Sequence, residues 1–150
     1  MSFLNKPKVI ISACILGDYC RYDGKTKEIN AVIEAYKDYE IIPFCPEAPL
    51  FGTPRQRISV VEIEGENRII TDETLVDVTL RLEEEIRDFI SKHQDIDSII
   101  LKSKSPSCGF GTTPILNEKR EPLKLGNGIA AQEFLRSYKE IKILDEKSFT

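Results

Sequence analysis

Three of the four cysteines of this 150-residue chain lie just after short apolar runs of the kind that form buried strands. Cys14 follows residues 8–13, Cys45 follows residues 40–44, and Cys108 follows residues 97–102. In an open α/β sheet, the carboxyl ends of parallel strands meet at one edge, and ligands bind in the crevice outside that edge. We therefore expect the three thiols to converge on one metal ion or metal cluster.

The loops that carry these cysteines are rich in glycine and proline. They span residues 12–24, 43–55 and 102–109. Proline restricts the backbone and glycine lets a bulky group approach it closely, which suits a cluster or a substrate better than a buried core thiol. Cysteine is also among the most buried residue types, so three inert core thiols are the alternative. The occurrence of three such loops favours ligands.

Segments with helical spacing lie between the apolar runs. Three helices are predicted from apolar residues at this spacing: Ile29, Val32, Ile33 and Tyr36; Leu75, Val78, Leu82, Ile86, Phe89 and Ile90; and Ala131, Phe134, Leu135 and Tyr138. Asp72 and Glu73 favour the start of the second helix, and Lys92 favours its end. The third helix is expected to follow a loop at residues 125–128 and to precede a short strand at residues 141–144.

This βα repeat predicts one α/β domain that comprises residues 1–150. Right-handed crossovers would give a Rossmann-like, mostly parallel sheet with helices on both faces. Residues 60–63 and 68–70 can pair as a small β-hairpin. A chain of 150 residues is about the length of one domain and can bury a core without disulfides.

Composition restricts the partners. The net charge is −4, with 21 basic and 25 acidic residues. The sequence contains no block of basic residues that would indicate a nucleic-acid partner. The N-terminus lacks a signal peptide, and no apolar stretch approaches the roughly 18 residues that would span a membrane. We expect a cytoplasmic protein that acts on a small molecule, with cysteines that serve as ligands, nucleophiles or core residues rather than in disulfides. The sequence indicates no oligomeric state.

Four separated blocks carry a family resemblance. They are residues 12–17 (SACILG) with 20–24 (CRYDG), residues 45–47 (CPE) with 53–55 (TPR), residues 100–109 (ILKSKSPSCG), and residues 126–128 (GNG). In this order they resemble a bacterial and archaeal domain-of-unknown-function family that includes the thiouracil desulfidases. The chain departs from the family pattern at residues 48–52 and 110–117, so the resemblance does not fix the substrate.

The resemblance implies a [4Fe-4S] cluster held by Cys14, Cys45 and Cys108, with one open iron. Clusters are held by thiolates, and an iron without a protein thiolate is a Lewis acid that can accept a substrate sulfur. The implied reaction is a non-redox desulfuration of a small thiocarbonyl compound such as 2-thiouracil. Water attacks the activated carbon, and cleavage of the C–S bond leaves a carbonyl product and sulfide.

Two residues would assist this reaction. Glu47, two residues after Cys45, would move protons to or from water or the substrate. Ser105 would orient or protonate the substrate, and Ser107 is the less favoured residue for contact with it. Alternatively, Glu47 caps a helix or pairs with Arg55, and the hydroxyls of the Ser-Pro-Ser turn bond their own backbone.

Other polar residues are left outside the predicted site. Lys102 and Lys104 could steer an anionic substrate, but lysines at a strand end are usually solvated. His93, the only histidine, falls at the exposed end of a helix, where it would cap carbonyl groups. The GNG block at residues 126–128 could present N–H groups to an anion, although a tight turn explains it equally well.

Two other functions are compatible with these residues. The first is a redox sensor or sulfur carrier, which would bind iron without turning over any thio-compound. The second is a zinc-binding domain that uses all four cysteines. The spacing of Cys14 and Cys20 fits no zinc knuckle, and we expect Cys20 to be a spare or structural thiol. We place the desulfidase first, the sensor or carrier second and the zinc domain third.

Overall fold

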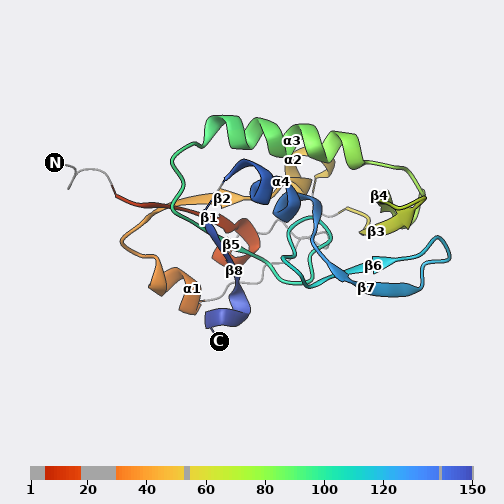
Figure 1. Ribbon diagram of the computed structural model, residues 1–150. Coiled ribbons are helices and arrows are strands. Elements are labelled where there is room, and N and C mark those ends of the chain that lie inside the picture. Colours follow the sequence, from red (N-terminus) through yellow and green to blue (C-terminus); the bar gives the residue numbers. More distant parts are fainter. Residues whose placement is uncertain (1–5, 18–29, 53–54, 139, 150) are drawn as a thin grey trace.

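The computed structural model describes residues 6–17, 30–52, 55–138 and 140–149, so that Ile29 and Cys20 lie outside the described residues (Figure 1). The elements, with two short 3₁₀ helices named η, are β1 (Lys8–Ser12), η1 (Ala13–Leu16), α1 (Asn30–Ala35), β2 (Glu40–Phe44), α2 (Glu47–Phe51), β3 (Ile58–Ile63), β4 (Glu66–Thr71), α3 (Thr79–Lys92), β5 (Ser98–Leu101), β6 (Thr113–Leu116), β7 (Pro122–Gly126), α4 (Ile129–Ser137), β8 (Lys142–Asp145) and η2 (Glu146–Phe149).

The predicted parallel sheet is present. It has four strands in the order β2-β1-β5-β8, and every neighbouring pair is parallel. The four predicted strands match these elements to within two residues. The chain passes from β1 outward to β2 on one side, and from β5 outward to β8 on the other. The topological switch point therefore lies between β1 and β5, which is where ligands bind in open α/β sheets.

Helices cover both faces of this sheet, as the sequence predicted. Successive side chains of a strand point to opposite faces. Ile10 and Ile99 belong to a core cluster with residues of α3 and α4, whereas Val9, Ile11 and Ile100 belong to a second cluster with residues of η1 and α1. In Figure 1, α3 and α4 accordingly lie on one side of the sheet and α1 on the other.

A second four-stranded sheet, in the order β4-β3-β6-β7, extends the predicted hairpin. Strands β3 and β4 pair antiparallel, which confirms the hairpin, and β6 joins β3 in parallel. The strands β6 and β7 were not predicted. The predicted loop at residues 125–128 is wrong for residues 125 and 126, which belong to β7. Strand β7 is exposed along most of its length, so its sequence lacks the apolar alternation of a half-buried strand.

The helix α3 begins later than Asp72, Glu73 and Leu75 indicated. It starts at Thr79, and Leu75 has a φ of 57° and is 67% exposed. The preceding segment pairs with β4 instead, because the N–H group of Val78 donates to the carbonyl oxygen of Ile69 at 2.9 Å. Tertiary pairing has overridden a local helix signal.

The other two helices follow the prediction with one exception. Val32 of α1 and both Ala131 and Phe134 of α4 are buried. Leu135 is 42% exposed, which contradicts the prediction, because Ala130 is also buried and the buried stripe of α4 is rotated away from Leu135. The longest described helix, α3, has 14 residues, and no described helix combines the length and apolar character needed to cross a bilayer.

Candidate functional site

A cavity of about 320 Å³ opens at the carboxyl ends of β1, β2 and β5. All six residues that the sequence predicted for the site line it: Cys14, Cys45, Glu47, Ser105, Ser107 and Cys108. They come from three loops that are far apart in the chain. The parallel sheet brings these loops together because its strands end at one edge, next to the switch point.

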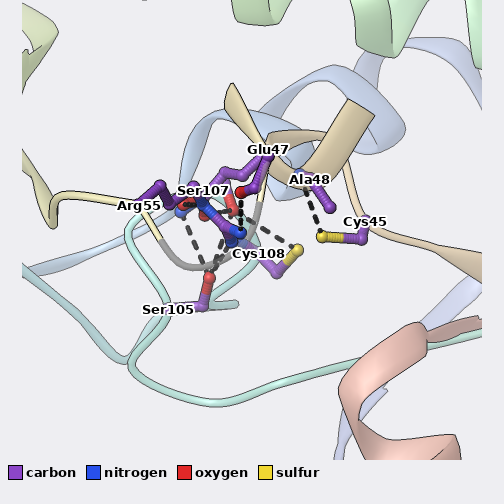
Figure 2. Close-up of polar contacts among 8 residues, drawn as sticks. Cys45, Glu47, Ala48, Arg55, Ser105, Ser107 and Cys108 are labelled. Carbon is purple, nitrogen blue, oxygen red and sulfur yellow. Dashed lines mark hydrogen bonds and ion pairs between the residues drawn. The ribbon is translucent and has the colours of Figure 1, made fainter. Parts of the chain in front are cut away.

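Cys14 and Cys45 are placed by short helical turns directly after their strands. Cys14 lies in η1 and is buried, and Ile15 beside it fixes this turn in the core. The turn ends at Gly17, whose φ of 98° favours glycine. Cys45 lies between β2 and α2, is partly exposed, and its Sγ accepts the N–H group of Ala48 at 3.5 Å (Figure 2).

Ser105 shapes the turn that carries Cys108. Its Oγ accepts the backbone N–H groups of Ser107 at 3.3 Å and of Cys108 at 3.0 Å (Figure 2). The predicted alternative, in which the hydroxyl bonds its own backbone, is therefore present. The O–H group of Ser105 can still donate, because a hydroxyl has one donor besides two acceptor lone pairs. Ser107 Oγ lies 3.2 Å from Ser105 Oγ.

The N-terminus of α4 holds the same turn from the other side. The N–H group of Gly128 donates to the carbonyl oxygen of Gly109, and that of Ala130 donates to the carbonyl oxygen of Ser107, both at 2.7 Å. A Cβ atom on residue 128 would lie 2.6 Å from the carbonyl carbon of Ser107 and 2.8 Å from the nitrogen of Cys108. This close approach explains the second glycine of the GNG block.

Glu47 makes polar contacts on both of its carboxylate oxygens. Ser107 Oγ donates to Glu47 Oε2 at 2.6 Å, and Arg55 Nε donates to Glu47 Oε1 at 3.2 Å (Figure 2). Arg55 also donates from Nη1 to the carbonyl oxygen of Gly52 at 2.9 Å. The predicted pairing with Arg55 is present, and it leaves Glu47 bonded to a hydroxyl in the wall of the cavity.

Sequence reasoning missed a buried carboxylate behind this cavity and misjudged a lysine in its wall. Lys102 lines the cavity, and its Nζ lies 3.2 Å from Glu146 Oε2, so it is not simply solvated. Burial opposes the charge on Glu146, but hydrogen bonds from Ser103 and the charge of Lys102 hold the pKa of Glu146 below its usual value. No motif or spacing marked Glu146.

The cysteines suit a cluster by their chemistry. Burial, and next the proximity of Cys45, raise the pKa of the Cys108 thiol to about 12. A thiolate at this position therefore needs a nearby cation, which bound iron would supply. Within the described residues, no three Cys, His, Asp or Glu side chains are arranged to hold one metal ion. Ligands of a cluster bind different irons, so they lie farther apart than the ligands of a single ion.

Comparisons with known proteins agree with this geometry. A family model for 2-thiouracil desulfurase matches residues 9–146. The solved structure of the [4Fe-4S]-dependent thiouracil desulfidase TudS (DUF523Vcz) is 32% identical, has a TM-score of 0.71, and the match covers 95% of this chain and 93% of that chain. The uncharacterized protein YbbK of Bacillus subtilis (strain 168) is 28% identical in an alignment over 111 residues, and the match covers 69% of this chain and 74% of YbbK. The chain belongs to the 2-thiouracil desulfurase family.

Proposed function

We propose that this protein is a [4Fe-4S]-dependent desulfidase that converts a small thiocarbonyl compound of the 2-thiouracil type to its carbonyl product and sulfide. The observation that carries the proposal is the cavity, in which three cysteines and a hydrogen-bonded serine–glutamate pair line one space. Family membership and the similarity to a [4Fe-4S]-dependent desulfidase support it.

Cys14, Cys45 and Cys108 would hold the cluster. Three thiolates leave one iron of a four-iron cluster without a protein ligand. When bound, the cluster would supply a Lewis-acidic iron at which a substrate sulfur can bind. The remaining steps fall to side chains in the same cavity.

Ser105, Ser107 and Glu47 are placed to move a proton. The Oγ atoms of the two serines lie 3.2 Å apart, and Ser107 Oγ lies 2.6 Å from Glu47 Oε2. Water that attacks the thiocarbonyl carbon must lose a proton, and the departing sulfide must gain one. We assign the transfer to this chain of three groups, with Glu47 as the proton acceptor. Ser105 takes a proton from the attacking water in place of its 3.3 Å bond from the Ser107 N–H group, while it passes its own O–H proton to Ser107 and Ser107 passes its proton to Glu47. Ser107, only 1% exposed, links the two.

Arg55 orients the acceptor. Its bond to Oε1 turns the other carboxylate oxygen of Glu47 toward Ser107. The carbonyl oxygen of Gly52 fixes Arg55 in turn. Glu47 would thus act from one orientation, which favours proton transfer along the serines.

The first experiment is anaerobic reconstitution, followed by analysis of iron, sulfide and zinc and a 2-thiouracil turnover assay on one sample. The proposal predicts about four irons per chain and release of sulfide with uracil. Glu47→Gln should keep the iron and lose turnover. Glu133→Gln is the matched control, because Glu133 is a buried carboxylate paired with Arg87 outside this cavity.

Other outcomes of this experiment point to the alternatives. Iron without turnover of 2-thiouracil or related thio-compounds would favour the redox sensor or sulfur carrier. Zinc at about one ion per chain that is lost in Cys20→Ser would favour the zinc domain. Full activity of Glu47→Gln would remove Glu47 from the mechanism and leave the cluster assignment intact.

A further inference from the structure

A buried carboxylate lies behind one wall of the cavity. Glu146 is the first residue of η2 and is 7% exposed. It accepts the backbone N–H group of Ser103 at 2.7 Å, the hydroxyl of Ser103 at 2.5 Å and the ammonium group of Lys102 at 3.2 Å. Glu146 itself does not line the cavity, whereas both of its partners do.

The segment that Glu146 holds lacks the support of a strand or helix. Lys102 and Ser103 come directly after β5, and the next residue, Lys104, has a φ of 64°. A side chain other than glycine is strained in this left-handed region. Such a conformation persists only where its surroundings fix it. The bonds to Glu146 on one side, that of the Lys102 N–H group to Ser12 Oγ at 2.9 Å on the other, and that of the Lys104 N–H group to Thr112 Oγ1 at 2.9 Å together supply this support.

All the donors of the Lys102 ammonium group have acceptors within this wall. An ammonium group has three N–H donors, and Nζ contacts Ser103 O at 3.1 Å, Ser103 Oγ at 3.5 Å and Glu146 Oε2 at 3.2 Å. The charge of Lys102 is therefore compensated from behind the cavity. Without the carboxylate, a half-buried ammonium group would lose its counter-charge and could turn toward the cysteines.

The end of the described chain fixes Glu146 itself. In the same 3₁₀ helix, Phe149 packs edge-on against Tyr36, with ring centroids 5.8 Å apart. Phe149 and Tyr36 both pack against the core cluster on the α1 face of the sheet. The carboxylate is thus held by a segment that contributes no residue to the cavity.

We propose that Glu146 is a positioning residue, which acts through Ser103 and Lys102 to fix the shape and charge of the cavity wall after β5. The effect on KM rests on the proposed desulfidase function. The anchoring of Lys102 and Ser103 by Glu146 does not. Because the wall bounds the substrate without donating a group to the reaction, loss of Glu146 should raise KM more than it lowers kcat.

The test compares Glu146→Ala, Glu146→Gln and the control Glu62→Ala. Glu62 also pairs with a lysine, since Lys124 Nζ lies 3.4 Å from its Oε1, but it does not line the cavity. Glu146→Ala should lower kcat/KM on 2-thiouracil roughly 10- to 100-fold, with iron content unchanged. Glu146→Gln should lose less, because its amide oxygen can still accept the N–H group of Ser103. The control should match the wild type.

A second measurement needs no bound cluster. Hydrogen exchange at the Ser103 amide of the cluster-free protein should be slow in the wild type and in Glu146→Gln, and fast in Glu146→Ala. If the wild type turns over no thio-compound, the proposed function fails and this exchange alone decides the anchoring role. Unchanged exchange would overturn the inference, as would wild-type kcat/KM in Glu146→Ala or a loss of iron in proportion to the loss of activity.

Discussion

The two serines of the Ser-Pro-Ser turn occupy different positions in the hydrogen-bond network. Ser105 Oγ accepts two backbone N–H groups of the turn, including that of Cys108, whereas Ser107 Oγ donates to Glu47. Both serines have the same local sequence context, which does not distinguish the hydroxyl that accepts backbone N–H groups from the one that donates to Glu47. The bond between Ser107 and Glu47 spans 60 positions of the chain, so only the fold reveals it.

This difference predicts different phenotypes. Ser107→Ala breaks the contact with Glu47 without removing a backbone acceptor, so we expect iron content to stay and kcat to fall by about 10²- to 10⁴-fold, the usual range for loss of proton transfer. Ser105→Ala removes the acceptor for the Cys108 N–H group and should lower iron content as well. Iron analysis and turnover on the same samples measure both effects. Full activity in Ser107→Ala would exclude the proton path through that residue.

The carboxylate of Glu146 makes stability depend on pH. Burial opposes its charge, yet Ser103 and Lys102 hold its pKa below the ordinary value of 4.5. A group that is more acidic in the folded state stabilises the fold above its unfolded pKa, and the effect disappears as the pH falls through the folded pKa. The free energy of unfolding should therefore differ between the wild type and Glu146→Gln at about pH 7, and this difference should shrink as the pH falls below 4.5.

Urea unfolding of the cluster-free proteins at several pH values measures this difference. The control compares the wild type with Glu62→Gln. The partner of Glu62, Lys124, is exposed, and exposed ion pairs contribute little. The free energy of unfolding should therefore differ little between these two proteins at any pH. A constant difference between the wild type and Glu146→Gln from neutral to acidic pH would contradict the assigned ionisation of Glu146.

At the scale of elements, the sequence predicted the parallel sheet far better than the second sheet. The strands β1 and β5 are buried on both faces and consist of continuous apolar runs, which are unambiguous. The strand β7 is exposed, and β6 contains a proline in a run of only four residues. Their pairing depends on partners distant in sequence, and no local pattern carries that information.

The cavity itself follows from the predicted elements. Once β1, β2 and β5 are parallel, Cys14, Cys45 and the turn before Cys108 must meet at one edge. The support that α4 gives to the turn with Cys108 could not be predicted. The GNG block is as compatible with a simple tight turn as with a close contact between two segments. The contact of Gly128 with the turn that carries Cys108 depends on how α4 packs, which is a tertiary property.

This contact predicts that Gly128→Ala damages metal binding. The new Cβ would lie 2.6 Å from the carbonyl carbon of Ser107, so either the turn with Cys108 or the start of α4 must shift. Overpacking of this kind costs about 1–3 kcal/mol, and we expect iron content to fall below that of the wild type. Iron analysis after reconstitution and urea unfolding measure the two effects.

Gly65→Ala provides the control for this substitution. Its φ of 81° makes alanine strained, but nothing lies within 4 Å of the new Cβ, and Gly65 does not line the cavity. It should cost about 1 kcal/mol and leave iron content unchanged. Equal iron content in Gly128→Ala and Gly65→Ala would show that the approach of α4 does not position Cys108.

At the scale of the whole molecule, one core cluster contains residues of both sheets. Ile10 and Ile99 of the parallel sheet belong to it together with Val60, Ile69 and Ile115 of the second sheet. Phe134 of α4 is a fully buried member of the same cluster. Elements that share a core lose their stability together, so we propose that residues 1–150 fold as one domain, as their length predicted.

A single substitution can test this cooperativity. Phe134→Ala should lower the free energy of unfolding by about 3–5 kcal/mol, the usual cost of emptying a buried aromatic site. If the two sheets unfold as one unit, hydrogen exchange at the amides of Ile10 and Ile115 should accelerate by the same factor, because both depend on global unfolding. The control Leu80→Ala alters a side chain that is 64% exposed and should change neither. Faster exchange at Ile10 with unchanged exchange at Ile115 would mean that the parallel sheet unfolds without the second sheet, and the chain would then consist of two cooperative units.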